Sequence, residues 1–292
     1  MKPVVLSVCV ICYNQADFIM QALGSVIEQK VNFSWEVIIA DDCSTDGTRE
    51  IVLDYKLRYP DLITILSRDK NIGAAKNFIE LINAANGKYV AYLEGDDFWT
   101  METKLQQQVD FLEQNPSFAI CFTRCRETFS ENINDLHNYT DNGSGEKTTT
   151  TINELIFRNY IQTCTVVFRN KLFGKFPDWY IDLKMGDWPL HLLNAQHGNI
   201  KYLPILTAVH RNHSSGVWSS RSALSKINQT ITVYDSLEKH TDLYKLPNFK
   251  KAKSNLYLSS VKYHLREGNI LKAFANFCKG FYIHPLPYKK PI

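Results

Sequence analysis

The sequence predicts an α/β fold in which a mostly parallel central sheet is flanked by helices and followed by a C-terminal helical extension. Two observations predict the sheet. Strand-like and helix-like patterns alternate over the first 130 residues, and the strand-like runs are apolar almost throughout. Such runs are typical of parallel strands that helices cover on both faces. A third observation predicts the extension, because only helical patterns remain past residue 219.

Apolar runs give the expected strands, and amphipathic segments give the expected helices between them. The strands are expected at 4–12, 35–42, 62–68, 88–95, 117–125, 163–170 and 200–211. The helices are expected at 14–29, 44–55, 71–87, 101–116, 152–159 and 186–198. The stretch 130–151 is polar and rich in turn-forming residues, which predicts a loop or a boundary. Residues 254–285 are expected to form a helical hairpin.

The helix predictions depend on side-chain periodicity and on end signals. The segment 14–29 places one apolar stripe on a single face, formed by Phe18, Ile19, Ala22, Leu23, Val26 and Ile27. The next helix is preceded by the capping residues of "STDG", and the third is expected to end at Gly87. Phe98 and Trp99 are expected to start the packing of the helix at 101–116.

Composition describes an ordinary globular chain of 292 residues, with 45% hydrophobic and 12% aromatic residues. No apolar run is long enough to cross a membrane. The N-terminus has no signal-peptide cleavage pattern, so the expected location is the cytoplasm, either free or attached peripherally at the inner face of the cell membrane. The seven cysteines lie in apolar segments, and Cys9 and Cys12 form a CxxC without a second ligand pair. Buried, reduced thiols are therefore expected.

Charge is distributed unevenly, although the formal net charge is only +3. From Lys245 onward the chain has nine lysines and one arginine but a single acid, Glu267. The basic region has apolar residues between its lysines, which favours docking on an anionic inner leaflet. The alternatives are a solvated helix face and a hairpin packed on the rest of the chain. No nucleic-acid-binding motif is present, so nucleic acid is not an expected partner.

Polar residues follow the ends of three expected strands. Tyr13 and Asn14 follow the first, Asp41 and Asp42 end the second, and "EGDD" (94–97) ends the fourth. Ligands of open α/β sheets bind beyond the carboxyl ends of the parallel strands. The combination fits a ligand with a planar ring, hydroxyls and phosphate. Since carboxylates repel phosphate, a divalent metal, Mn or Mg, is expected between them.

Each of these motifs also has a simpler explanation. The segment "DDCSTDG" is often only a turn and a helix cap. Tyr13 would serve equally in packing, and "EGDD" would form a turn or an incomplete calcium loop. The chain has no P-loop and no GxGxxG, so the usual backbone cradle for phosphate is absent from the sequence.

Six motifs in order resemble the family 2 glycosyltransferases over about residues 4–220. They are "LSVCVICYN", "VIIADDCSTDGT", "NIGAAKN", "YLEGDDFW", and "GDWPL" with "HRNHSSGVWS". The resemblance implies a GT-A fold with a Rossmann-like nucleotide-sugar-binding half at 1–129, an acceptor half at 130–218, and a helical region at 219–292. It implies an inverting hexosyl- or N-acetylhexosaminyltransferase of polysaccharide and cell-envelope biosynthesis. The expected donor is a nucleotide-diphosphate sugar, UDP favoured, and the acceptor a saccharide or a lipid-linked saccharide.

The resemblance also implies site residues. Tyr13 would lie against the base, Asp41 would accept a hydrogen bond from it, and Asp42 would support the pocket. The remaining nucleotide-binding candidates are Asn14, Arg68, Asn71, Gly73, Asn77, Glu94 and Asp97. For Arg68 a solvated loop charge is an equal alternative. Asp96 and His213 would hold the metal, His213 being preferred to His210. Trp218 would close a loop over the nucleotide or fill the core.

Asp187 is the expected general base, and its alternative is the N-cap of the helix that it precedes. The chain departs from the family pattern at Glu94, where aspartate is usual. This departure supports one competing function, a catalytically inactive module that binds nucleotide-sugar or carbohydrate. A second competitor, a sugar-1-phosphate nucleotidyltransferase, would need a glycine-rich N-terminal loop with Arg and Lys, which "ICYNQADF" lacks.

Overall fold

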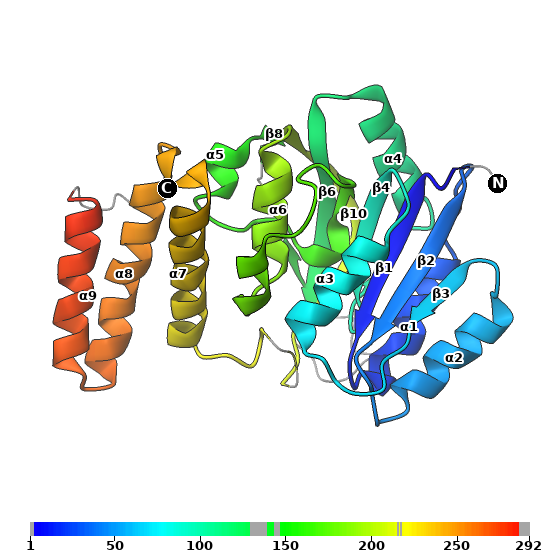
Figure 1. The fold of residues 1–292 in the computed structure, drawn as a ribbon, viewed down its shortest axis with the longest axis horizontal. Coiled ribbons are helices and arrows are strands. Elements are labelled where there is room, and N and C mark those ends of the chain that lie inside the picture. Colours follow the sequence, from blue (N-terminus) through cyan, green and yellow to red (C-terminus); the bar gives the residue numbers. More distant parts are fainter. Residues whose placement is uncertain (1–2, 129–138, 143–146, 215, 217, 286–292) are drawn as a thin grey trace.

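The computed structural model of the protein describes residues 3–128, 139–142, 147–214, 216 and 218–285. A ten-stranded sheet runs through the described chain in the order β3-β2-β1-β4-β9-β6-β10-β5, with β7 beside β6 and β8 beside β10. Helices lie on both sides of this sheet, and α7, α8 and α9 stand in a row at one end of the molecule (Figure 1). The predicted α/β class and the helical extension are confirmed.

The first four long strands form the parallel half. They are β1 (Leu6–Cys12), β2 (Trp35–Asp41), β3 (Ile63–Leu66) and β4 (Tyr89–Glu94), and every neighbouring pair among them is parallel. The helices between them are α1 (Ala16–Ile27), α2 (Thr48–Arg58) and α3 (Ala74–Ala84). The register pairs Cys12 with Asp41 and Ile11 with Glu94, so the polar strand ends meet at one edge.

The other half of the sheet contains both parallel and antiparallel strand pairs. Strand β9 (Val167–Arg169) lies between β4 and β6 (Phe118–Thr128) and is antiparallel to both, while β6 and β10 (Asn199–Arg211) are parallel. The helix α4 (Lys104–Gln114) precedes β6. The strand expected at 163–170 is therefore too long, because Thr163–Thr165 form the 3-10 helix η1. A four-residue β7 (Tyr139–Asn142) and a two-residue β8 (Thr149–Thr150) occupy parts of the expected loop 130–151, whose residues 130–138 and 143–146 lie outside the described chain.

Phe98 and Trp99 form β5, antiparallel to β10 at Val209 and Ala208, and Trp99 shares a buried cluster with Leu105 and Val109 of α4, as expected. Two further expectations need correction. The helix expected at 152–159 is limited to α5 (Ile152–Leu155), which a Thr151–Glu154 capping box starts. Helix α3 ends at Ala84, before Gly87. Gly87 is needed for close packing instead, since a Cβ there would lie 2.5 Å from the backbone nitrogen of Ser7.

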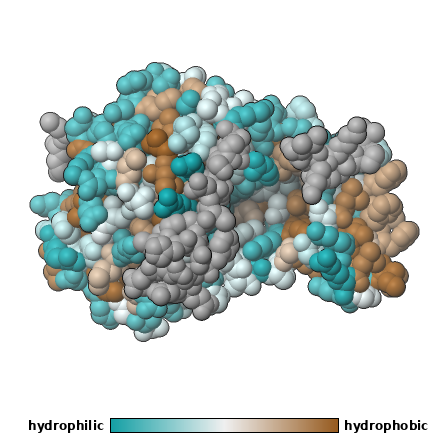
Figure 2. Space-filling view, turned by 180° about the vertical axis from the view of Figure 1, so that it is seen from behind, coloured by the Kyte–Doolittle hydropathy of each residue, from teal (hydrophilic) through white to brown (hydrophobic). Residues whose placement is uncertain are grey.

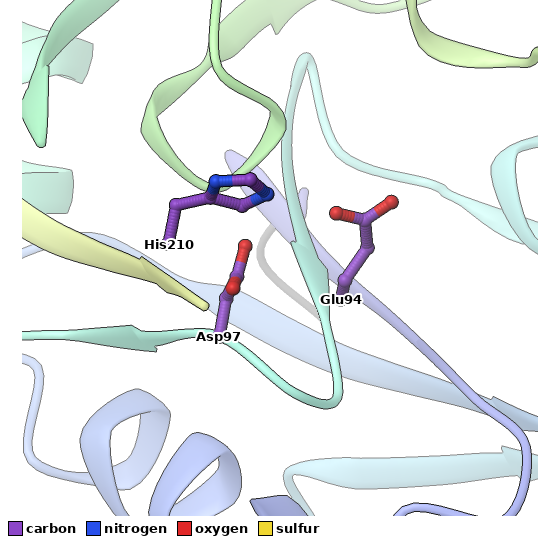
Figure 3. A group of neighbouring side chains, drawn as sticks. All are labelled: Glu94, Asp97 and His210. Carbon is purple, nitrogen blue, oxygen red and sulfur yellow. The ribbon is translucent and has the colours of Figure 1, made fainter. Parts of the chain in front are cut away.

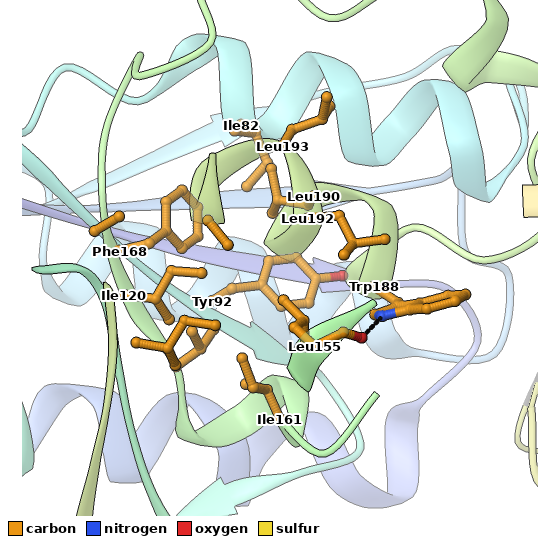
Figure 4. Packing of buried hydrophobic residues seen from close by; sticks show 14 of the residues in the cluster. Ile82, Tyr92, Ile120, Leu155, Ile161, Phe168, Trp188, Leu190, Leu192 and Leu193 are labelled. Atoms are coloured by element: carbon orange, nitrogen blue, oxygen red, sulfur yellow. Dashed lines mark hydrogen bonds between the residues drawn. The ribbon is translucent and has the colours of Figure 1, made fainter. Parts of the chain in front are cut away.

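Apolar side chains fill both sides of the sheet. On one side, α1 and α2 cover β1 and β2. On the other, α3, α5 and α6 (Asp187–Ala195) pack together, with Trp188 donating from Nε1 to the carbonyl oxygen of Leu155 at 3.0 Å (Figure 4). Every residue of α6 from Trp188 to Ala195 is buried. This burial fixes the position of the Asp187 backbone at the start of α6.

After β10 the rest of the described chain is helical, with α7 (Ala223–His240), the 3-10 helix η3 (Asp242–Lys245), α8 (Phe249–Arg266) and α9 (Ile270–Ile283). A further 3-10 helix, η2 (Asp178–Asp182), lies earlier in the chain, before α6. Within the described residues, no helix is both long enough and apolar enough to cross a membrane. Cys9 and Cys12 are buried free thiols, as expected, and burial raises the pKa of each.

Lys104 is a fully buried lysine that no feature of the sequence had indicated. Its Nζ donates to Gln108 Oε1 at 2.7 Å and lies 4.5 Å from the ring centroid of Trp99. Burial lowers the pKa of Lys104 to about 7. Since the unfolded lysine keeps its proton up to about pH 10.4, the unfolded chain binds more protons between those values, and the folding stability should rise with pH in that window.

We expect the free energy of unfolding to increase by about 2 kcal/mol more between pH 7 and pH 9 in the native protein than in Lys104→Met. Denaturant titrations at both pH values measure this difference. The variant is the control, because it keeps every other titrating group. Parallel pH profiles for the two proteins would show that Lys104 keeps a normal pKa.

Candidate active site

The carboxyl ends of β1, β2 and β4 bring the predicted polar residues together, and most of them hold each other in place. Asp41 is buried, and its Oδ1 accepts a hydrogen bond from the Ser44 hydroxyl. Its Oδ2 forms an ion pair with Arg49 Nε at 3.0 Å. Arg49 also donates to the carbonyl oxygen of Arg68 at 2.6 Å. No sequence motif indicated Arg49, which supplies a positive charge beside the buried Asp41 side chain.

Asp42 fixes the segment 71–77 against the sheet. Its two carboxylate oxygens accept from the backbone nitrogens of Ile72 at 2.8 Å and Gly73 at 3.0 Å. Asn71 Oδ1 accepts from the same Gly73 nitrogen at 3.0 Å. Gly73 has φ +88°, which favours glycine. Asn77 is fully buried and donates from Nδ2 to the carbonyl oxygen of Ala40 at 3.0 Å, so it ties α3 to β2.

Three other predicted residues differ in their surroundings. Tyr13 is 48% exposed, so packing in the core is not its role. Asn14 has φ +50° and accepts from the Thr45 nitrogen at 2.9 Å. Arg68 is not a solvated loop charge, since its Nη2 forms an ion pair with Glu80 at 2.7 Å and its side chain is largely buried.

Asp96 and His213 are in direct contact. His213 Nε2 lies 3.0 Å from Asp96 Oδ2, and the hydrogen bond to Asp96 raises the pKa of His213. The imidazole also packs on Phe18, with ring centroids 4.8 Å apart. Two residues far apart in the sequence thus present an oxygen and a nitrogen ligand at one point.

A second group of potential ligands lies beside the first. One ligand atom each of Glu94, Asp97 and His210 lies within 4.8 Å of the others. Figure 3 shows Glu94, at the end of β4, and Asp97, from the turn before β5, beside His210 of β10. The sequence favoured His213 over His210 as the metal ligand, but the structure places both imidazoles next to carboxylates. Carboxylate oxygens with imidazole nitrogens form a donor set that suits Mn²⁺, and the oxygens alone suit Mg²⁺.

Crowding of carboxylates perturbs this second group. Burial, together with the charge of Asp96, raises the pKa of Asp97 to about 6, while His210 and the Arg211 N–H oppose the shift. Burial and the charges of Asp97, Asp96 and Asp187 raise the pKa of Glu94. Asp97 Oδ1 accepts from the Arg211 nitrogen at 2.8 Å. Its Oδ2 is buried and receives no N–H or O–H from the described residues. A bound cation would satisfy that atom.

Arg211 is the main residue that the sequence analysis missed. Its Nη1 donates to the backbone oxygen of Asp96 at 2.5 Å, and its Nη2 donates to Gln21 Oε1. The guanidinium lies between two rings, with centroids 5.2 Å away for Phe18 and 4.5 Å away for Phe98. The only signal in the sequence was a cation at the end of an apolar strand. Arg211 thereby holds the "EGDD" turn in place from the side of β10.

Asp187 is partly buried and lies near Glu94, since its charge contributes to the raised pKa of Glu94. The charges of both carboxylates, after burial, raise the pKa of the Tyr92 hydroxyl, and the charge of Asp187 acts likewise on Tyr180. Burial raises the pKa of Asp187, opposed by the Trp188 N–H and by Asn159. Asn159, also missed, donates from Nδ2 to Asp187 Oδ2 at 2.7 Å. Gly186 is the N-cap of α6, so the N-cap alternative for Asp187 is wrong.

Trp218 does not fill the core, because 40% of its surface is exposed and Lys226 Nζ lies 5.7 Å from its ring centroid. The structure therefore excludes one of the two expected roles. Its other role, closing over a nucleotide, stays a prediction.

The family model for glycosyl transferase family 2 matches residues 7–174, which is more than half of the chain. The chain belongs to glycosyl transferase family 2. Among curated relatives of this family 2 chain, the uncharacterized protein Rv1520 of Mycobacterium tuberculosis is 37% identical over 215 residues, covering 74% of the chain. The chain spans 61% of the length of that relative. The putative teichuronic acid biosynthesis glycosyltransferase TuaG of Bacillus subtilis is 40% identical over 122 residues, 42% of the chain and 46% of TuaG.

Solved structures confirm the GT-A fold. TarS of S. aureus, residues 1–349 in complex with UDP-GlcNAc, superposes with a TM-score of 0.63 at 16% identity, covering 98% of this chain and 93% of TarS. The mannosyltransferase PcManGT of Pyrobaculum calidifontis, in complex with GDP-Man and Mn²⁺, gives a TM-score of 0.62 at 19% identity, covering 98% and 77%. At these identities the likeness establishes the fold.

Proposed function

We propose that the chain is a metal-assisted inverting glycosyltransferase. It would move a sugar from a nucleotide diphosphate to a hydroxyl of a saccharide or a lipid-linked acceptor. One observation carries the proposal: the Asp96–His213 pair, the Glu94–Asp97–His210 group and Asp187 gather at one edge of a family 2 sheet. Residues 1–129 would form the donor half, residues 130–218 the acceptor half, and residues 219–292 a helical region.

The metal would be held by Asp96 Oδ2 and His213 Nε2, which are 3.0 Å apart. Asp97, whose Oδ2 is buried without an N–H or O–H donor among the described residues, would add charge from the adjacent position. When bound, Mn or Mg would neutralise charge on the departing diphosphate. PcManGT, which shares the fold, was solved in complex with Mn²⁺, and that complex supports the assignment.

The donor nucleotide would bind at the ends of β1 and β2. The exposed ring of Tyr13 would stack on the base. Asp41 would accept from the N–H of a uracil, which favours a UDP-sugar, and Asn14, Asp42 and the segment 71–77 would shape the pocket. TarS and PcManGT were solved with UDP-GlcNAc and GDP-Man, and these ligands support a nucleotide-sugar while leaving open the base and the choice of hexose or N-acetylhexosamine.

Asp187 would act as the general base. Its carboxylate would take the proton of the acceptor hydroxyl, the hydroxyl oxygen would bond to the anomeric carbon, and the bond from that carbon to the diphosphate would break. Attack opposite the leaving group inverts the configuration. A hollow of about 480 Å³ lies near the segment before Asp187, with Asp182, Lys184, Ser222, Ser225 and Asn228 among its lining residues. Their hydroxyl, amide and charged groups suit a polyhydroxylated acceptor.

Nucleotide-sugar hydrolysis with and without Mn²⁺ tests the proposal. We expect slow, metal-dependent release of nucleoside diphosphate from one sugar in a panel of UDP-, dTDP- and GDP-sugars. Acceptor saccharides, free and lipid-linked, added with the preferred donor should accelerate that release. Tight donor binding without any turnover would favour the inactive binding module. Release of pyrophosphate from a nucleoside triphosphate and a sugar phosphate would favour the nucleotidyltransferase.

A further inference from the structure

Helix α9 exposes its large apolar side chains and buries its small ones. Leu271, Phe274 and Phe277 are 84%, 66% and 50% exposed, and Phe281 and Tyr282 are 56% and 91% exposed. The buried positions of the helix are Ala273 and Gly280. A helix that packs on a water-soluble core does the reverse, because burial of large apolar side chains supplies most of its stability. Figure 2 shows hydrophobic surface at the end of the molecule that α9 occupies.

Helix α9 docks on α8 by close backbone approach and by polar contacts. A Cβ at Gly280 would lie 2.9 Å from Leu258 Cγ, so the glycine is what lets the helices meet. Ser254 Oγ donates to the Gly280 carbonyl oxygen at 2.7 Å, and Asn276 Nδ2 donates to Ser260 Oγ at 2.8 Å. Small residues and hydroxyl or amide hydrogen bonds between helices, with large apolar residues facing outward, are typical of helix pairs in lipid.

The charge of the two helices indicates which lipid headgroups would attract them. Neither α8 nor α9 contains an acidic residue. Lys253 is used internally, since it forms ion pairs with Asp235 at 2.7 Å and with Glu238. The other basic residues of the two helices are Lys250, Lys251, Lys262, Arg266, Lys272 and Lys279. A basic helix pair with an exposed apolar face is attracted to anionic headgroups by charge and inserts by apolar burial.

We infer that α8 and α9 attach the protein peripherally to an anionic membrane. The apolar face of α9 lies in the boundary between headgroups and acyl chains, and the lysines and Arg266 contact the headgroups. The helices do not span the bilayer, which agrees with the absence of any membrane-crossing helix in the described residues. The alternative of a packed helical hairpin is partly correct, since the two helices do pack on each other. That packing leaves the apolar face of α9 exposed. This inference does not depend on transferase activity.

Co-sedimentation of the full chain with vesicles tests it without any donor or acceptor. We expect binding to vesicles of phosphatidylcholine with phosphatidylglycerol, and weaker binding to phosphatidylcholine alone. The triple variant Leu271→Ser, Phe274→Ser and Phe277→Ser should bind more than about a hundredfold more weakly, because each side chain contributes roughly tenfold when buried in lipid. The matched control is Leu57→Ser on α2, whose leucine is 80% exposed but lies on another helix.

Two further measurements complete the test. Lys272→Gln and Lys279→Gln should each weaken binding about fivefold at low salt. A polarity-sensitive fluorophore on Cys278, which is exposed on α9, should shift to the blue with anionic vesicles, and Cys278→Ser should show no signal. Equal vesicle binding by the triple variant and the native chain would overturn the inference. So would a self-associating native chain that ignores vesicles and becomes monomeric in the triple variant, since the face would then bind a second copy.

Discussion

Asp187→Asn is expected to lower the rate of sugar transfer by about 10²- to 10⁴-fold, which is the usual contribution of a general base. The amide keeps the shape of the side chain and remains able to contact Asn159, but it accepts no proton from an acceptor hydroxyl. Donor affinity should be unchanged, because the proposed nucleotide and metal ligands are other residues. The kcat of transfer to the best acceptor, measured beside donor binding by calorimetry, separates the two effects.

Asp178→Asn is a suitable control, since Asp178 lies in η2 of the same region and carries the same charge. It should retain transfer. Thermal unfolding of both variants checks that α6 is intact, and the loss of a negative charge in its first turn should cost only about 0.5 kcal/mol. Transfer by Asp187→Asn at the native rate would remove Asp187 from catalysis and leave the family fold untouched.

The surroundings of Asp187 also tune it. Desolvation of the carboxyl raises its pKa, and the charges of Asp187 and the neighbouring Glu94 both act on the buried Tyr92. A raised pKa makes a carboxylate a stronger base for a hydroxyl proton. The hydrogen bond from the Asn159 amide lowers the pKa of Asp187, and it orients the Asp187 carboxylate through Oδ2. Asn159 is thus a positioning residue in the proposed mechanism.

The parallel half of the fold was predictable from the sequence because its strands are buried on both faces. Continuous apolar runs identified β1, β2 and β4, and parallel pairing then required their polar ends to meet at one edge. Strand β5 was not predictable. Two residues carry no periodicity, and Phe98 and Trp99 become a strand only because β10 lies beside them. Gly87 looked like a helix end, so the sequence predicted too long an α3. The glycine is required instead by its close approach to the backbone of Ser7, which is distant in sequence.

The contrast between local sequence signals and contacts of distant segments also separates the predicted site residues from the missed ones. Tyr13, Asp41 and Asp96 stand in local motifs at strand ends. Arg211 and His210 reach the site through the pairing of β10 with β5, and Asn159 reaches it from a loop, so tertiary contacts alone bring them there. The sequence likewise showed apolar residues between the lysines of α9. Which face of α9 would pack was unpredictable, since the contact depends on the fit of Gly280 against Leu258.

Asp96→Asn is expected to reduce metal-dependent donor binding by more than about a hundredfold. Loss of a residue that only orients a ligand costs 10- to 100-fold in metal affinity, and loss of a ligand should exceed that. His213 would keep its place on Phe18 but face an amide in place of a carboxylate. Calorimetric titration of Mn²⁺ and of UDP, separately and together, measures the effect. Chelation of the metal from the native protein should reproduce it.

A comparison with Asp97→Asn distinguishes the two groups of ligands. If Asp96 and His213 are the ligands, His213→Ala should resemble Asp96→Asn, while Asp97→Asn should weaken metal binding less. The opposite order would place the metal among Glu94, Asp97 and His210, whose ligand atoms lie within 4.8 Å of one another. Asp110→Asn on the exposed face of α4 controls for the loss of one negative charge. Asp96→Asn leaves the Arg211 contact untouched, because Arg211 donates to the backbone oxygen of Asp96. In Asp97→Asn the amide oxygen remains able to accept from the Arg211 nitrogen, so both substitutions preserve an acceptor for Arg211 in the turn.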